Sequence, residues 1–371
     1  AEPSGMDTYL FSCTDHSGTR DRFEGCVAGV STGRRTGGSD GGEPGPVVMR
    51  IAYVYDAVYP WVTGGVEKRV WELATRLADD HDVHWYGLHY WDGPAVTERA
   101  GVTLHGVTDP PDDLYTDGRR SIPAALSFAA HLGPAIATER FDVIDCQEFP
   151  YFPIFACELA EALGRATVLV TWHEVWGDYW YDYLGRKGIA GKLVERLAVD
   201  LPSGHLAVSE RTRSDVLDLG ASTVPVVPNG IDHEVLGAVE PADRDLDVLF
   251  AGRLIPEKNA SLLVEAVAAA DGTAPETVLL GEGPEADRIA ALVDDRGLGG
   301  SVELPGFLDA YEDVLALMQT ADVFVLPSER EGFGITVLEA LACGTPVVTV
   351  DHPRNAASEL VDDGRTGVVC D

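Results

Sequence analysis

The sequence predicts an α/β protein made of two doubly wound, Rossmann-like domains. Short apolar runs typical of strands alternate with helical patterns from residue 50 onward, as in parallel sheets. The series is interrupted once, by the polar stretch 233–246, which contains Gly237 and Pro241 and which we interpret as a linker. A chain of 371 residues is long enough for two cores.

Residues 1–48 differ from everything after them. They are rich in Gly, Ser, Asp and Arg and show no apolar periodicity. This composition predicts a disordered segment, or an extension ahead of a natural start at Met49, and a regulatory tail remains open.

The first domain, residues 49–232, begins with a strand and a glycine-led helix. Gly64 and Gly65 open a helix whose apolar positions (66, 70, 73, 74 and 77) recur at helical spacing. Apolar runs predict strands at 51–55, 83–86, 142–146, 166–171, 205–208 and 224–227.

The second domain, residues 247–371, repeats the alternation. Strands are predicted at 247–251, 277–280, 301–304, 322–326, 347–350 and 367–370, and helices near 261–270, 285–296, 310–320, 335–342 and 355–361. The chain stops directly after a strand, so we expect one or two further helices to complete this domain.

The charge balance limits the choice of partners. The chain has 27 Lys and Arg against 61 Asp and Glu, a net charge of −34, and only four lysines. General nucleic-acid binding needs a basic surface, so this composition argues against it. An acidic, lysine-poor surface suits high salt, where self-repulsion is screened, and we therefore interpret the source as halophilic.

The cysteines and the hydropathy indicate the compartment. Six cysteines lack C-x-x-C spacing, which argues against a zinc cage or a disulfide framework and favours a reducing cytoplasm. No apolar run approaches the roughly twenty residues that span a bilayer. Docking on the inner face of a membrane remains open.

The stretch 322–350 is the most informative part of the chain. A strand stopped by Pro327 leads into the loop Glu331-Gly332-Phe333-Gly334, and an apolar helix follows. Glycines let backbone amides approach an anion, and the helix N-terminus adds a positive dipole. Within that helix, a carboxylate at Glu339 is costly to bury without a hydrogen bond, although a solvated helix face remains an alternative.

Cations follow the first strand of the second domain. Arg253 offers a bidentate fork and Lys258 a point charge, the pair suited to a diphosphate, unless both are ordinary surface salt-bridge partners. Gly281 and Gly283 after the next strand allow close approach to a ligand, as any tight turn would. Phe307, after the third strand, either edges a nucleotide base or belongs to the core.

The first domain offers a second set of candidates. Gly65 lies at a helix start, the geometry for close approach to a phosphate, but no G-x-G-x-x-G or Walker motif occurs. His173 lies at the carboxyl end of the strand 166–171. It either holds a substrate hydroxyl or carbonyl, or it has a structural role.

An aromatic cluster near basic residues is the candidate acceptor site. It contains Trp176, Tyr179, Trp180 and Tyr181, and Arg186, Lys187 and Lys192 follow it. Such a cluster receives a sugar face, lies at a membrane interface near a lipid-linked acceptor, or packs beneath a loop.

These motifs together resemble a known family. Residues 50–371 resemble retaining glycosyltransferases of family 4 (glycosyl transferases group 1), which have the GT-B fold, two Rossmann-like domains facing across a cleft. The resemblance rests on five motifs that occur in order. They are Gly64-Gly65, His173, Pro228-Asn229-Gly230-Ile231-Asp232, Gly252-Arg253-x4-Lys258-Asn259 and Glu331-x7-Glu339.

The resemblance implies a role for each candidate. Arg253, Lys258 and Gly65 would bind the diphosphate of a UDP- or GDP-sugar. Glu331 and the backbone of 332–334 would hold the sugar, and Glu339 the ribose, while Gly283 and Phe307 would border the base. His173 would contact the sugar near its reacting carbon, which makes His173 and Glu331 the expected catalytic residues.

The resemblance also implies a reaction. A hexose would pass with retention to a glycan, lipid-linked or small-molecule hydroxyl, as in polysaccharide or glycoprotein biosynthesis, by front-face attack with the leaving phosphate as base. We expect no cofactor and no metal, since no D-x-D triplet is suitably placed. The alternatives are a nucleotide-sugar epimerase and a non-catalytic sugar-nucleotide binder; the presence of both Glu331 and His173 favours catalysis.

Overall fold

The computed structural model describes residues 47–371, except 112–114 and 117–118, so the expectation for residues 1–48 lies almost wholly outside it. The described residues form two compact units, 47–227 and 228–371. The division falls before the predicted linker 233–246, which contains the short helix α9 (His233–Gly237).

The first unit contains a seven-stranded sheet in the order β3-β4-β2-β1-β7-β8-β9. Neighbouring strands are parallel except β3 and β4, which are antiparallel. Its strands are β1 (Arg50–Val54), β2 (Asp82–Gly87), β3 (Val96–Arg99), β4 (Val102–Gly106), β7 (Val143–Gln147), β8 (Thr167–Trp172) and β9 (Gly204–Ala207). Five of the six strands predicted for this domain are thus confirmed.

The prediction at 224–227 is wrong, and β3 and β4 were not predicted. Only one bridge, between Val226 and Ala207, forms in place of the predicted strand. Pro225 and Pro228 flank this bridge and have no N–H for a sheet ladder. The missed strand β3 is a largely exposed edge strand without an apolar run.

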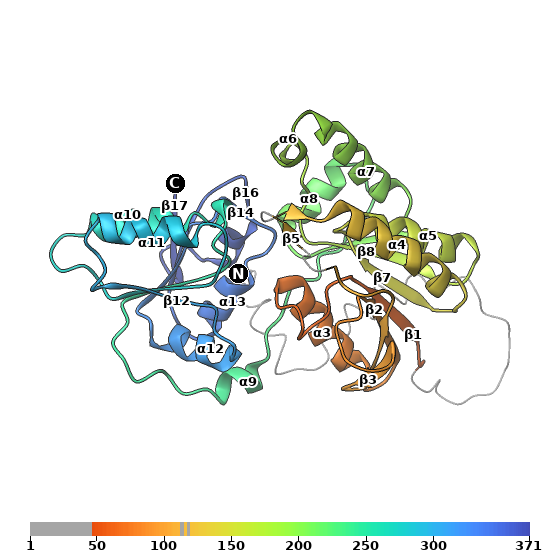
Figure 1. The fold of residues 1–371 in the computed structure, drawn as a ribbon, viewed down its shortest axis with the longest axis horizontal. Coiled ribbons are helices and arrows are strands. Elements are labelled where there is room, and N and C mark those ends of the chain that lie inside the picture. The colour runs from red at the N-terminus through yellow and green to blue at the C-terminus, as the bar shows by residue number, and fades with distance from the viewer. Residues whose placement is uncertain (1–46, 112–114, 117–118) are drawn as a thin grey trace, which may run out of the picture. The chain divides into compact units, whose positions relative to one another are not determined.

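Helices cover both faces of this sheet (Figure 1). They are α3 (Gly65–Leu77), α4 (Ile122–Ala137), α5 (Phe152–Ala162), α6 (Tyr179–Leu184), the 3₁₀ helix η2 (Gly185–Lys187), α7 (Gly188–Asp200) and α8 (Glu210–Asp218), with the short ladder β5 (Tyr115–Thr116) and β6 (Arg119–Arg120). Val70 and Leu77 of α3 join one apolar cluster. Phe128 of α4 and Ile154 of α5 join a second cluster. No helix in the described part of the chain is long and apolar enough to cross a membrane.

The second unit contains a six-stranded, all-parallel sheet in the order β12-β11-β10-β13-β15-β17. Its strands are β10 (Val248–Ala251), β11 (Thr277–Leu280), β12 (Val302–Gly306), β13 (Val323–Leu326), β15 (Val347–Val350) and β17 (Gly367–Cys370), and the two-residue strands β14 (Arg330–Glu331) and β16 (Arg354–Asn355) pair separately. The six strands predicted here are confirmed.

Four helices of this unit also match the prediction. They are α10 (Ala260–Ala268), α11 (Ala286–Asp295), α12 (Tyr311–Thr320) and α13 (Ile335–Ala342), accompanied by the 3₁₀ helices η3 (Pro256–Lys258) and η4 (Ala356–Leu360). In Figure 1, α10 and α11 lie on one side of the sheet and α12 on the other. The helix predicted at 355–361 is only a 3₁₀ helix, because Asn355 pairs in β16 and caps the turn through Ala357.

Each strand order reverses direction once. In the second unit the chain runs outward from β10 through β11 and β12, then returns to β13 on the other side of β10. In the first unit the reversal lies between β1 and β7. Ligands of doubly wound sheets bind at such reversals, beside the carboxyl ends of the strands. The loops after β1, β7, β10 and β13 are therefore the places to look for a site.

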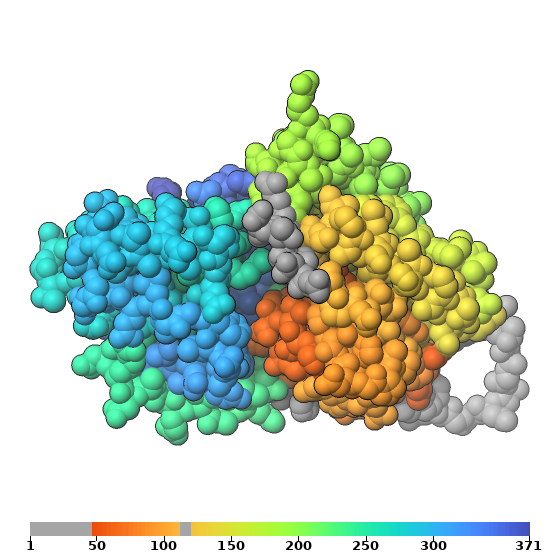
Figure 2. Space-filling view, viewed as in Figure 1, coloured from red at the N-terminus to blue at the C-terminus, as the bar shows by residue number. Residues whose placement is uncertain are grey.

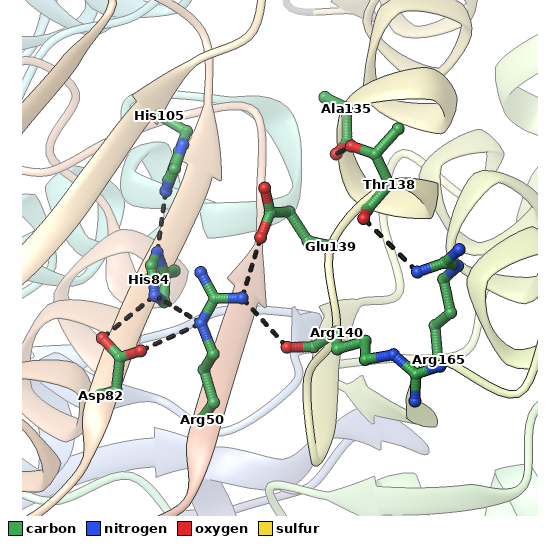
Figure 3. A network of polar contacts seen from close by, with 9 residues as sticks. All are labelled: Arg50, Asp82, His84, His105, Ala135, Thr138, Glu139, Arg140 and Arg165. Carbon is green, nitrogen blue, oxygen red and sulfur yellow. Dashed lines mark hydrogen bonds and ion pairs between the residues drawn. The ribbon is translucent and has the colours of Figure 1, made fainter.

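The opposite end of the first sheet holds a polar network (Figure 3). Arg50 donates through Nε to Asp82 Oδ2 at 3.0 Å and through Nη1 to Glu139 Oε2 at 2.9 Å. His84 Nδ1 lies 2.8 Å from His105 Nε2, so one imidazole donates to the other. Burial is the largest cause that lowers the pKa of His105 to about 4, so this ring is neutral near pH 7.

The neutral state of His105 makes folding sensitive to acid. Its ordinary pKa is 6.5 and its folded pKa about 4, so the unfolded chain takes up a proton first and stability falls as pH drops through this window. With partial exposure taken into account, the loss between pH 6.5 and 5 is about 1 kcal/mol. His105→Phe keeps a ring against Tyr86. Between pH 6.5 and 5, its free energy of unfolding in urea should fall by about 1 kcal/mol less than that of the wild type. His131→Phe, at an exposed site, is the control, and an unchanged pH dependence in His105→Phe would contradict the assignment.

Candidate functional site

An ion pair joins the two loops at the reversal point of the second unit. Lys258 ends η3, after β10, and its Nζ contacts Glu331 Oε1 of β14, after β13. The two side chains are only 17% and 10% exposed, although 73 residues separate them in the sequence. The structure therefore brings two of the predicted site residues into direct contact.

Main-chain contacts fix this pair. The Glu329 amide donates to the Glu257 carbonyl at 2.9 Å, which ties the loop after β13 to η3. Glu331 pairs with Asn355 across β14 and β16. The fully buried Asn355 donates through Nδ2 to the Val350 carbonyl at 2.9 Å. Asn355 was not predicted, since no local motif marks it.

Further groups suited to an anion lie in the same two loops. Arg253 is exposed in the loop that follows β10. Gly334 adopts a left-handed conformation, with φ of +85°, and forms the N-cap of α13. The first amides of a helix have no partner within the helix and carry a partial positive charge. The unit therefore offers a guanidinium, an ammonium and a helix N-terminus for an anion.

Gly281 and Gly283, after β11, are required because neighbouring main-chain atoms leave no room for a Cβ. A Cβ on Gly281 would lie 1.9 Å from the Gly252 carbonyl oxygen, and one on Gly283 would lie 2.3 Å from that of Leu254. Both residues have positive φ, +132° and +156°. They allow the Arg253 loop to pack against the loop after β11, and the predicted contact of Gly283 with a base remains a prediction.

Glu339 is buried and has the hydrogen bond that its burial requires. The Tyr311 hydroxyl donates to its Oε1 at 2.7 Å. Tyr311 begins α12, and its contact with Glu339 was not predicted. Of the predicted aromatic residues here, Phe333 is buried and Phe307 is exposed. The ribose and base roles of Glu339 and Phe307 remain predictions.

In the first unit, His173 belongs to a buried polar chain. Its Nε2–H donates to Gln147 Oε1 at 2.8 Å, and Gln147 Nε2 donates to Asp145 Oδ1 at 3.3 Å. The Thr171 hydroxyl also donates to this oxygen, at 2.7 Å. Burial, helped by the charge of Arg69, lowers the pKa of His173 to about 3. His173 is therefore a neutral imidazole whose Nδ1 can accept a hydrogen bond.

Gly65 is the first residue of α3, as predicted. The Glu67 carboxylate lies close by, since a Cβ on Gly64 would be 2.5 Å from Glu67 Oε2. A phosphate at this helix start would therefore meet a carboxylate as well as the helix dipole. The phosphate contact of Gly65 remains a prediction.

The aromatic cluster is largely part of the core. Trp176 and Trp180 are buried, with ring centroids 4.7 Å apart. The fully buried Glu195 of α7 accepts from the amides of Trp176 and Gly177 at 2.8 and 3.0 Å and thereby holds the loop after His173. Tyr181 remains exposed, so it is the member best placed to meet an acceptor.

Within the described residues, no group of three or more His, Cys, Asp or Glu side chains could hold a metal ion. The side chains available to a ligand are instead the cations of the second unit and the neutral imidazole of the first.

Family models match both units. Residues 63–235 match Glycosyltransferase Family 4, and residues 236–371 match Glycosyl transferases group 1. The chain is 35% identical over 357 residues to a glycogen synthase of Mycobacterium tuberculosis, covering 87% of this chain and 82% of the relative. It is 31% identical over 350 residues to an alpha-maltose-1-phosphate synthase of Mycolicibacterium smegmatis, covering 86% and 84%.

A solved structure matches the fold. The Anabaena protein HepE in complex with UDP-glucose aligns with a TM-score of 0.65 at 20% identity, covering 86% of this chain and 85% of that one. Two parallel α/β units with these matches define a GT-B glycosyltransferase. The chain belongs to glycosyltransferase family 4, as the motifs in the sequence indicated.

The contact between the loops after β10 and β11 predicts a specific sensitivity. Gly281→Ala should cost about 3 kcal/mol or more in urea unfolding, because its Cβ overlaps the Gly252 carbonyl. Gly272→Ala is the matched control: φ there is also positive, at +95°, but nothing lies within 4 Å, so the cost should be about 1 kcal/mol. Equal costs would show that the contact is unimportant.

Proposed function

We propose that this protein is a retaining hexosyltransferase. It transfers a hexose from a UDP- or GDP-sugar to a hydroxyl of a glycan, lipid-linked or small-molecule acceptor. The observation that carries the proposal is the largely buried Lys258–Glu331 pair at the reversal point of the second sheet, whose lysine follows β10 as Arg253 does.

The pair suggests how the donor is bound. A diphosphate carries more negative charge than one carboxylate, so it competes with Glu331 for Lys258 and also attracts Arg253. Glu331 is then left with acceptor oxygens beside the sugar, where they receive sugar hydroxyls. Amides of 332–334 support the sugar, and Glu339 binds the ribose while Tyr311 orients its carboxylate.

Charge development then favours transfer. As the sugar–phosphate bond breaks, negative charge grows on the nucleoside diphosphate, where Arg253, Lys258 and the N-terminus of α13 stabilise it. This set of groups can serve without a metal. With retention of configuration, the acceptor hydroxyl attacks on the face that the phosphate leaves and gives its proton to that phosphate.

His173 is the proposed contribution of the first unit to the sugar. A pKa of about 3 means that it does not act as an acid near pH 7. Since Nε2–H is engaged with Gln147, its Nδ1 accepts a hydrogen bond from a sugar hydroxyl. Its role is therefore orientation of the sugar near the reacting carbon.

The named relatives support this substrate class. The HepE structure holds UDP-glucose, and the relatives are named for glycogen and maltose-1-phosphate synthesis. A glucosyl donor and a glycan or sugar-phosphate acceptor are therefore the first to test. The free cysteines Cys146 and Cys157 are consistent with the proposed cytoplasmic location.

Nucleotide binding tests the donor site. Isothermal titration with UDP, GDP and ADP in molar salt should show selective binding of one nucleotide. Lys258→Ala should weaken it at least about tenfold, because a charge-assisted hydrogen bond is lost. Lys187→Ala, an exposed lysine of the other unit, should leave binding unchanged.

Two results would contradict the donor site. One is a folded wild type that binds none of the three nucleotides, and the other is equal binding by wild type and Lys258→Ala. Release of an altered sugar without any acceptor would favour the epimerase alternative instead.

A second test separates binding from turnover. His173→Ala should slow cleavage of the sugar–phosphate bond of the donor by about 100-fold, because the sugar is no longer oriented. The affinity for the free nucleotide should stay unchanged, since Arg253 and Lys258, the side chains proposed to bind the diphosphate, belong to the second unit. Turnover is followed by nucleotide release, and the anomeric configuration of the product by NMR. Parallel losses of affinity and turnover would contradict the role of His173.

A further inference from the structure

Three tryptophans gather at the surface of the first unit. Four of the seven tryptophans in the chain are buried in the core, namely Trp85, Trp172, Trp176 and Trp180. The other three lie together and form what we call the tryptophan patch: Trp61, Trp71 and Trp91. Figure 2 shows much of the stretch 59–109, in red-orange to orange, on the face toward the viewer.

The tryptophan patch is built from two loops, a helix and an edge strand. Trp61 lies in the loop after β1 and Trp91 in the loop after β2, and their ring centroids are 5.4 Å apart. The guanidinium carbon of Arg99, which ends β3, lies 5.2 Å from the centroid of Trp61 and 5.8 Å from that of Trp71 in α3. Trp91 Nε1 donates to the Pro94 carbonyl at 2.9 Å. These contacts order the rings before any ligand binds.

Trp61 is the ring that this arrangement leaves open. It is 37% exposed, whereas the four core tryptophans are 8% exposed or less. Burial of apolar surface drives association, so an ordered indole that stays in contact with water favours a binding role. We therefore consider which ligand the surroundings of Trp61 would accept.

The charges around the tryptophan patch discriminate between ligands. The segment 88–109 carries three exposed carboxylates, those of Asp92, Glu98 and Asp109, and the single guanidinium of Arg99. Together with a net charge of −34, this excess of carboxylates opposes a nucleic acid, an anionic bilayer and a second copy of the chain alike. A neutral ligand meets no such opposition.

A neutral sugar chain has the chemistry that these groups recognise. The C–H groups on one face of a sugar ring pack flat on an indole, and the hydroxyls at its rim reach carboxylates and guanidinium groups. An exposed cation–π contact is weak, so a sugar can displace Arg99 from Trp61 and then accept hydrogen bonds from it. A basic protein fits less well, because Arg99 already holds the cation position over Trp61 and Trp71.

The position of the tryptophan patch in the fold indicates the length of this ligand. Its two loops begin at the carboxyl ends of β1 and β2, the same edge of the sheet at which His173 follows β8. The ends of β2 and β8 are three strand spacings apart, roughly 15 Å. A chain of several sugar rings spans this distance, whereas a single ring does not.

We propose that the tryptophan patch binds an extended, neutral glycan, the acceptor of the transfer, at a distance from its reacting end. The identity of this ligand rests on the proposed function, and the proposal narrows the acceptor from three classes to one. It also adds a site, since none of the residues proposed to hold the donor belongs to the patch.

Native affinity electrophoresis of the full chain tests the proposal without a donor or turnover. Glycogen in the gel should retard the wild type, whereas hyaluronan, whose carboxylates are repelled, should not. Trp61→Ala should raise the apparent Kd for glycogen about tenfold, because the stacked ring is lost. Trp61→Phe keeps an aromatic ring and should restore most of the binding. Leu126→Ala, at a 48% exposed leucine of α4, is the control and should bind like the wild type.

Several outcomes would overturn the proposal. A wild type that glycogen does not retard overturns it, as does a folded Trp61→Ala variant that is retarded like the wild type. Loss of retardation in Tyr181→Ala alone would move the glycan to the aromatic cluster. Equal retardation by hyaluronan would contradict the selection of a neutral ligand, and retardation by polylysine instead of glycogen would assign the patch to a basic partner.

Nucleotide titration of the same samples separates this site from the donor site. Trp61→Ala should bind the nucleotide as the wild type does while its glycogen affinity falls. A wild type that binds the nucleotide but not glycogen would overturn this inference and leave the proposed function standing.

Discussion

The ion pair between Lys258 and Glu331 links the two loops that carry the candidate site of the second unit. These loops follow β10 and β13, which are neighbours in space but belong to opposite halves of the sheet. A largely buried lysine needs a counter-charge, so the contact fixes the ends of both loops together. The backbone bond from Glu329 to Glu257 and the hydrogen bond of the buried Asn355 then keep the loop that carries this carboxylate in place.

The first unit uses buried polar groups in a similar way. Burial raises the pKa of Asp145 to about 6, and hydrogen bonds from Thr171 and Gln147 partly offset the shift. Gln147 in turn fixes the tautomer of His173. Glu195 holds the following loop through two backbone amides. A loop whose donors are satisfied internally needs little reorganisation when a ligand binds.

How much of this could be predicted depended on how local each signal was. Strands such as β10 and β13 are short β-branched runs bounded by turn residues, so their sequence reveals them. Lys258 and Glu331 were found because each follows such a strand. Asn355, Tyr311 and Glu195 were not found, because the partners that give them a role lie elsewhere in the chain and only the fold brings them together. The edge strand β3 was missed since an exposed strand needs no apolar run.

Helix α7 shows another limit, because the spacing of its aliphatic residues does not reveal which way they face. Its sequence contains aliphatic residues four positions apart, and such a stripe on a helix usually faces the core. The direction is decided by Gly188 and Gly191, whose missing side chains let Trp180 occupy the inner face. With Glu195 also engaged inside, the inner face is complete, and the aliphatic residues have only the outside left. Periodicity therefore predicts that a stripe exists, whereas the contacts of its small residues determine where it points.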